Sequence, residues 1–218
     1  IGPNNASVDW FRISVHGKSA HVSTPHLGVD ALYIASQIVV AIQALITRRT
    51  NPLESILIGI GKLDAGTAYN VVAEEAAMEG TIRVFSPELR KATKERIELV
   101  ASSIAAMYGG TVSIEWKDFT SPLINDEEST LEVRKVLTSV FGKESVVESR
   151  TPSLGGDDFA EYILKVPGCY AFVGSRNPEV PETGVAHHNS HFDVDDGALS
   201  VMVNLMSNYA IEFLNGEV

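Results

Sequence analysis

Apolar and polar positions alternate along four short segments in the first half of the chain. In residues 8–16 the side chains of Phe11, Ile13 and Val15 fall on one face of the segment, and mostly polar side chains fall on the other. A period of two residues is typical of a strand with one buried face. The same alternation returns over residues 56–60, 76–84 and 112–116, so the pattern predicts four half-buried strands.

Two longer segments repeat their apolar residues at helical spacing. The first covers residues 31–46 and ends before Pro52, and its apolar residues form one stripe. The second begins at Ser86-Pro87-Glu88, where a capping hydroxyl precedes proline and an acid, and it stops at Gly109-Gly110. Both segments are therefore predicted to be amphipathic helices.

The order of these elements predicts a fold for the first half. Strands and helices follow one another as β-α-β-β-α-β over residues 7–117, which is the order of a ferredoxin-like α+β domain. We therefore assign residues 1–117 to one ferredoxin-like domain.

The second half, residues 118–218, has fewer elements. Helices are predicted over residues 126–141, after Asp157-Asp158 and after Asp195 or Asp196, and residues 169–174 are predicted to be a strand. A long loop from Ser175 to His191 separates the last two elements, and such loops are uncommon unless functional. This half is expected to be the carboxyl-terminal part of an α/β layer whose remainder lies outside the chain.

Composition excludes some classes of protein. The 218 residues carry a net charge of -11, which argues against nucleic acid as a partner because phosphates are bound by clustered Lys and Arg. We find no signal peptide and no apolar run long enough for a membrane span, so we expect a soluble, cytoplasmic protein. The single cysteine, Cys169, excludes an intrachain disulfide and is expected to have a structural role in a buried strand.

The densest candidate chemistry lies near the carboxyl end. His187, His188 and His191 are three of the six histidines, and Asp193, Asp195 and Asp196 follow them. Imidazole and carboxylate groups in this density indicate a metal site or an acid/base site. Adjacent side chains rarely converge on one ion, so this segment can supply one ligand and the others must come from elsewhere. The alternative is that these histidines are exposed loop residues.

Five motifs together resemble a known family. They are Gly17-Lys18-Ser19-Ala20-His21, Gly66-Thr67-Ala68-Tyr69-Asn70-Val71-Val72, Gly80-Thr81-Ile82-Arg83, Gly155-Gly156-Asp157-Asp158-Phe159-Ala160 and His188-Asn189-Ser190-His191-Phe192. In order and spacing they resemble the dimeric metal-dependent amidohydrolases and exopeptidases of the aminoacylase and carboxypeptidase G type, in the branch of N-acyl-amino-acid and auxin-conjugate amidohydrolases.

The resemblance implies an architecture. Residues 1–117 would be a lid and dimerisation domain, and residues 118–218 would be the carboxyl-terminal portion of the metal-binding catalytic domain. The family's main metal ligands and its general-base glutamate lie in an amino-terminal half that this sequence does not match.

The resemblance also implies roles for four residues. His188 would be a metal ligand in a site for two divalent ions, which could be zinc, manganese or nickel. His21 would reach across a homodimer and stabilise the oxyanion, while Arg83 and Asn70 would bind the substrate. Two simpler alternatives stay open: His21 caps a turn after a strand, and Arg83 pairs with Glu79 on an exposed strand.

The implied function is hydrolysis of an amide bond next to a free carboxylate, in N-acyl amino acids or short peptides. The polypeptide alone is expected to be inactive, because the matched ligands and the general base are incomplete. A noncatalytic dimerisation module is the alternative. A ferredoxin-like RNA-binding unit is disfavoured by the net charge and by the lack of a basic, aromatic-rich strand pair.

Overall fold

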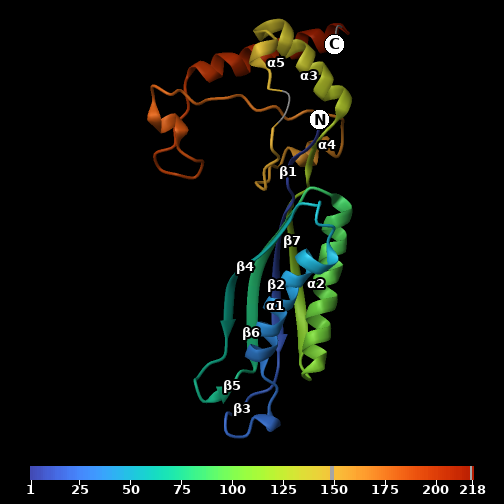
Figure 1. Cartoon of the computed structure of the whole chain (residues 1–218), viewed down its shortest axis with the longest axis vertical. Coiled ribbons are helices and arrows are strands. Elements are labelled where there is room, and N and C mark those ends of the chain that lie inside the picture. The colour runs from blue at the N-terminus through green and yellow to red at the C-terminus, as the bar shows by residue number, and fades with distance from the viewer. Residues whose placement is uncertain (148–149, 217) are drawn as a thin grey trace. The chain divides into compact units, whose positions relative to one another are not determined.

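The computed structural model describes residues 1–147, 150–216 and 218 (Figure 1). These residues fall into two compact units. One unit consists of Pro3–Ile124 and Pro152–Leu164, and the other of Ile1–Gly2, Asn125–Thr151 and Lys165–Val218. The division into two domains after residue 117 stays a prediction.

The first unit is built on a four-stranded antiparallel sheet. Its strands lie side by side in the order β4 (Ile56–Ala65), β6 (Glu75–Val84), β2 (Val8–His16) and β7 (Thr111–Thr120). Helix α1 (Ala31–Arg49) follows β2, and helix α2 (Pro87–Met107) follows β6. The chain order β2-α1-β4-β6-α2-β7 confirms the predicted ferredoxin-like arrangement.

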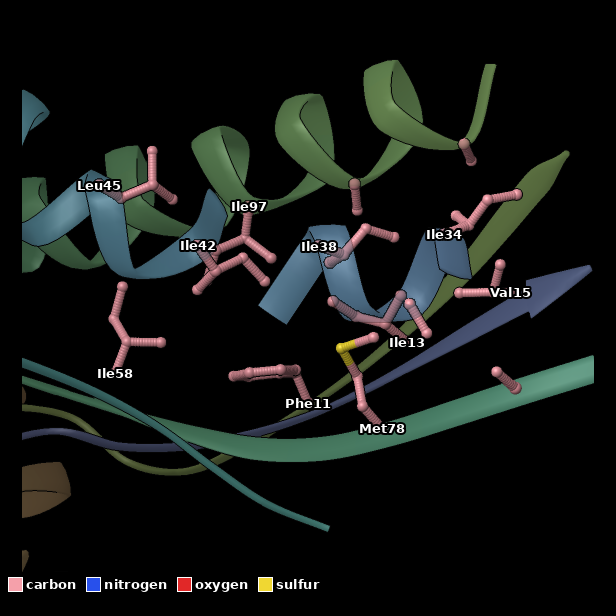
Figure 2. Close-up of a cluster of buried hydrophobic side chains, with 14 of the residues drawn as sticks. Phe11, Ile13, Val15, Ile34, Ile38, Ile42, Leu45, Ile58, Met78 and Ile97 are labelled. Carbon is pink, nitrogen blue, oxygen red and sulfur yellow. The ribbon is translucent and has the colours of Figure 1, made fainter. Parts of the chain in front are cut away.

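The core lies between the helices and one face of this sheet. Figure 2 shows side chains of β2 and β6 pointing toward α1 and α2; the fully buried ones include Phe11, Ile13, Val15, Met78, Ile34, Ile38, Ile42 and Ile97. Within the described residues, α1 is long and apolar enough to cross a membrane by length and composition. Its fully buried isoleucines pack in this core, but only 33% of that apolar stretch is buried in the structure.

A charged cluster occupies one end of the buried face of β2. The carboxylate of Asp9 is fully buried; it accepts hydrogen bonds from Arg90 Nε at 2.9 Å and Nη2 at 2.8 Å, and Lys94 Nζ lies 2.8 Å away. Asp118 on β7 completes the cluster. Burial raises its pKa, but the hydrogen bond and charge of Lys94, the charge of Arg90 and a hydrogen bond with Asp9 together lower it more, so the net pKa lies below the usual range. The contribution of Asp118 to stability is therefore present at neutral pH and is lost as the pH falls through this lowered value.

Several short elements complete the first unit. They are the paired strands β3 (Ala20–His21) and β5 (Val71–Val72), the 3-10 turn Pro25–Leu27 and helix α4 (Ala160–Ile163). Strands β1 (Gly2–Asn5) and β8 (Leu123–Asn125) form a further two-stranded sheet. Ser153 is bound to the segment that leads into β2, since its N–H donates to Asn4 O and its carbonyl accepts from Ala6 N, both at 3.0 Å.

The second unit contains two long helices. Helix α3 (Glu127–Phe141) is followed by the 3-10 turn Lys143–Ser145. A further 3-10 turn covers Pro181–Gly184 and precedes helix α5 (Gly197–Asn215). The hydroxyl of Tyr209 on α5 donates to Glu132 Oε2 on α3 at 2.9 Å. The predicted cap of the last helix was Asp195 or Asp196. Asp196 is the N-cap residue of α5, but its side chain makes no capping hydrogen bond. The carboxylate of Asp195 accepts from Gly197 N at 2.7 Å.

The strand predicted over residues 169–174 is wrong. The backbone N–H of Tyr170 donates to Asn125 Oδ1 at 2.9 Å, and its carbonyl accepts from Asn125 Nδ2 at 3.0 Å. A side-chain amide thus takes the place that a neighbouring strand would occupy. Burial raises the pKa of the Cys169 thiol in this segment, which disfavours a reactive thiolate at neutral pH.

Candidate functional site

His21 and Asn70 lie together at one end of the first unit. His21 pairs with Val71 across the β3–β5 ladder, and Val22 N donates to the carbonyl of Asn70 at 3.1 Å. We call this region, residues 20–27 and 66–72, the tip (Figure 1). Two predicted site residues that are 49 positions apart in sequence are therefore neighbours because two very short strands pair.

The hydrogen bonds of His21 define its tautomer. Its Nδ1 accepts a hydrogen bond from Ser23 N at 3.1 Å and lies 2.7 Å from Ser23 Oγ. A ring nitrogen that accepts a backbone N–H carries no proton, so the proton of the neutral ring is on Nε2. The local turn contact therefore uses one ring nitrogen and leaves Nε2–H as a donor on an exposed side chain.

The tip also exposes apolar side chains. Tyr69, next to Asn70, is 99% exposed, and Val22 and Leu27 are 49% and 59% exposed. Exposed apolar groups that gather beside hydrogen-bonding groups are typical of surfaces that become covered on binding. Tyr69 was not among the residues predicted from sequence; its place beside Asn70 in the Gly66–Val72 motif is the signal that points to it.

Arg83 lies near the opposite end of β6. Glu75 lies at the tip end of β6 and pairs with His16, and Arg83 lies eight positions further along the strand. At about 3.3 Å per residue, this corresponds to roughly 26 Å along the strand. The structure thus brings His21 and Asn70 together and keeps Arg83 apart from both.

The guanidinium of Arg83 is bound by neutral oxygen atoms. Its Nε donates to Thr81 Oγ1 at 3.2 Å, and its Nη1 donates to the carbonyl of Leu154 at 3.4 Å. The alternative partner, Glu79, contacts Lys62 Nζ at 3.4 Å and Arg12 Nη1 at 3.6 Å. Thr81 was not predicted as a site residue, although its position two residues before Arg83, on the same strand face, was a usable signal.

His188 lies in the loop before α5. Its φ is 63°, in the left-handed region that residues other than glycine rarely adopt, and its side chain is exposed. Among residues 1–147, 150–216 and 218, no group of three or more His, Cys, Asp and Glu side chains could hold a metal ion. The described side chains therefore fit one ligand position at His188 and do not form a metal site by themselves.

This arrangement predicts weak metal binding by the isolated 218-residue chain. One imidazole without partner ligands is not expected to retain zinc, because stable zinc sites use three or four protein ligands. After dialysis, elemental analysis should find far less than one zinc per chain, and His188→Ala should leave that content unchanged. Stoichiometric zinc retained by the chain would contradict the expectation.

Residues 5–108 match the family model of the M20 peptidase dimerisation domain. Thermostable carboxypeptidase 2 from Saccharolobus solfataricus is 36% identical over 215 residues, covering 98% of this chain and 53% of the relative. N-acetyl-L-cysteine deacetylase from Bacillus subtilis is 35% identical over 198 residues, covering 91% and 45%. Residues 5–108 therefore form an M20-type dimerisation domain.

A solved structure supports the same assignment. The YXEP protein of Bacillus subtilis, described as a dinuclear metal binding peptidase of the M20 family, matches with a TM-score of 0.78 and 29% identity. The match covers 98% of this chain and 52% of that protein. The resemblance and fold predicted from the motifs are therefore confirmed. This chain spans about half the length of the relatives it matches, and the roles of its four candidate residues stay predictions.

Proposed function

We propose that the protein hydrolyses the amide bond of N-acyl amino acids or short peptides that have a free carboxylate. The observation that carries the proposal is the tip, where a β3–β5 ladder holds His21 beside Asn70 with Nε2–H available as a donor. The names of the two relatives, a carboxypeptidase and an N-acetyl-L-cysteine deacetylase, describe amide hydrolysis of this kind.

Each of the three lid residues has a role that suits its chemistry. Nε2–H of His21 would donate to the oxygen that becomes negative when the amide carbonyl is attacked, a donor most effective in the transition state. The amide of Asn70 would add a hydrogen bond beside it. The guanidinium of Arg83 would bind the substrate carboxylate, since its planar fork matches two carboxylate oxygens.

His21 and Arg83 of one protomer are too far apart for one small substrate. Their separation, roughly 26 Å or more along β6 by the strand rise, is several times the length of an N-acyl amino acid. We propose that one active site takes Arg83 from its own subunit and the tip residues from the partner. A homodimer is therefore part of the catalytic proposal.

The proposed dimer surface is α1 with the edge strand β4. The stretch from Ala31 to Thr47 contains no charged residue, yet Val40 on it is 70% exposed. Helix α1 packs beside β4, whose outer edge has no neighbouring strand in the described sheet. The other edge strand, β7, exposes Glu115 and Lys117, and charges of this kind discourage edge pairing.

Val40→Glu is expected to convert the dimer to monomer, because the new carboxylate would be buried against the partner's α1. Sedimentation velocity at micromolar concentration measures the change. Leu99→Glu on α2 is the matched control, since Leu99 is 66% exposed on the other helix. This variant should stay dimeric. The surface assignment is wrong if the control dissociates while Val40→Glu does not.

Two divalent ions, which could be zinc, manganese or nickel, are proposed for the full-length protein. A relative described as dinuclear metal binding supports this number. The exposed imidazole of His188 would supply one ligand, and the other ligands would come from residues outside this chain.

The cytoplasmic localisation expected from the sequence stays a prediction.

Arg83→Ala in the full-length protein tests the substrate class. Loss of a charge-assisted hydrogen-bond pair should raise KM for an N-acetyl amino acid by about 10- to 100-fold. The matching N-acetyl amino acid amide, which lacks the carboxylate, should be affected much less. Arg12→Ala is the control, because Arg12 lies on the same sheet face and pairs with Glu79.

Equal effects of Arg83→Ala on the acid and on the amide would rule out the carboxylate clamp. The noncatalytic dimerisation module remains the second candidate, favoured by the lack of a metal-binding group among the described residues. Absence of turnover on both substrates by metal-supplied, full-length protein would support that module instead.

A further inference from the structure

We propose that Thr81 is a positioning residue that fixes the guanidinium of Arg83 in its substrate-binding orientation. The inference rests on the proposed function, because it gives Arg83 a carboxylate to bind. Its basis is a chain of hydrogen bonds in the first unit that runs from the sheet through Thr81 to Arg83.

The hydroxyl of Thr81 is used in both directions. It donates to the backbone carbonyl of Asp9 at 2.7 Å and accepts from Arg83 Nε at 3.2 Å. Because the hydroxyl proton is committed to a backbone oxygen, an oxygen lone pair faces Arg83 Nε. Threonine also has few χ1 rotamers, so its hydroxyl has a fixed direction on the strand.

The carbonyl of Asp9 is itself a rigid anchor. It belongs to β2 at the centre of the sheet, and its side chain is fully buried and bound by Arg90 and Lys94. The buried charge cluster and the hydroxyl of Thr81 therefore hold the same residue from two sides. A shift of the Thr81 hydroxyl would therefore break its hydrogen bond to this anchored residue.

A second contact holds Arg83 from the other side. The carbonyl of Leu154 accepts from Nη1 at 3.4 Å. The turn that bears it is closely packed, because Gly155 N donates to Ser153 Oγ at 3.1 Å and a Cβ on Gly156 would lie 2.2 Å from Val8 Cγ2. The first contact holds the turn's own shape, and the second shows that its backbone lies directly against Val8 of β2.

The two contacts select which edge of the guanidinium remains available. Arginine has five N–H donors, of which Thr81 and Leu154 take one on Nε and one on Nη1. Nη1 keeps one N–H and Nη2 keeps both of its N–H groups, so the terminal edge formed by these two nitrogens can still bind a carboxylate in bidentate fashion. Thr81 therefore favours terminal-edge binding and disfavours binding through Nε, and this preorganisation reduces the rotamer entropy lost on binding.

The test compares substrate preference in the full-length protein. The measured quantity is the ratio of kcat/KM for an N-acetyl amino acid to kcat/KM for its amide. Thr81→Val, which keeps the shape but removes the hydroxyl, should lower this ratio about tenfold, mainly through KM for the acid. Thr81→Ser keeps the hydroxyl and should stay within about threefold of the wild-type ratio.

Two further variants make the result specific. Thr93→Val is the matched control, because the buried Thr93 hydroxyl has no hydrogen-bond partner among the described residues and lies on α2, away from Arg83. The double variant Thr81→Val/Arg83→Ala should have the same ratio as Arg83→Ala alone, since Thr81 acts only through that side chain. Thr81→Ala replaces Thr81→Val in the cycle if the valine variant does not fold.

The possible outcomes separate the inference from the proposed function. If Arg83→Ala lowers the ratio but removal of the Thr81 hydroxyl does not, or if the two losses add in the double variant, the positioning role is overturned and the clamp survives. If Arg83→Ala leaves the ratio unchanged, the clamp and the positioning role both fail. The inference is supported if Thr81→Val lowers the acid-to-amide ratio of kcat/KM, if Thr81→Ser keeps that ratio, and if the double variant has no lower ratio than Arg83→Ala alone.

Discussion

His21→Ala in the full-length protein is expected to lower kcat by about two to three orders of magnitude without changing the bound metal. The reason is that a donor to the oxyanion acts mainly in the transition state, so KM should change little. Nδ1 of His21 already accepts from Ser23 N, which leaves Nε2–H as the proposed donor. Steady-state kinetics and elemental analysis of the same preparation measure both quantities.

His26→Ala is the control for this prediction. His26 lies in the Pro25–Leu27 turn of the tip and is exposed, but it has no proposed role in the reaction. Its replacement should leave kcat close to the wild-type value. A similar loss for both variants, or a loss of metal on replacing His21, would show that the tip acts through structure alone.

Asp9→Ala is expected to destabilise the sheet unit by about 3–5 kcal/mol, which is the largest stability effect we predict. The substitution removes the carboxylate that Arg90 and Lys94 share, and leaves two cations with side chains only 15% and 18% exposed. Breaking such a buried pair is costly because the two cations keep only Asp118, whose side chain is 56% exposed, and recover little hydration. Denaturant unfolding monitored by tryptophan fluorescence gives the free energy.

Asp64→Ala provides the comparison for Asp9→Ala. Asp64 on β4 also pairs with a cation, with Lys62 Nζ at 3.2 Å, but its side chain is 69% exposed. An exposed pair of this kind should contribute less than about 1 kcal/mol. Comparable losses for the two aspartates would contradict the idea that burial makes the Asp9 cluster critical.

Local periodicity was sufficient to predict the sheet unit. The alternation around Phe11 and Ile13 and the helical stripe through Ile34 and Ile38 reflect burial on a single face, which a sequence records directly. The strand at residues 169–174 could not be judged in this way. Whether an apolar segment becomes a strand depends on a partner, and here Asn125, distant in sequence, supplies the hydrogen bonds.

The site was predictable only in parts. His21, Asn70, Arg83 and His188 were found through motifs, but their mutual distances depend on tertiary structure. The pairing of β3 with β5 involves two residues on each strand, too few to leave a periodic signal. The ion pair of the buried Asp9 could not be predicted from the sequence either, because its partner Arg90 is 81 positions away.

The central claim is that one active site combines Arg83 of one subunit with His21 of the other. Mixing full-length His21→Ala and Arg83→Ala subunits under conditions that exchange partners tests it most directly. Each heterodimer then contains one site with both residues intact and one site with neither. We predict that purified heterodimers regain kcat/KM far above either parent variant. Heterodimers no more active than the two parents would contradict the cross-subunit site.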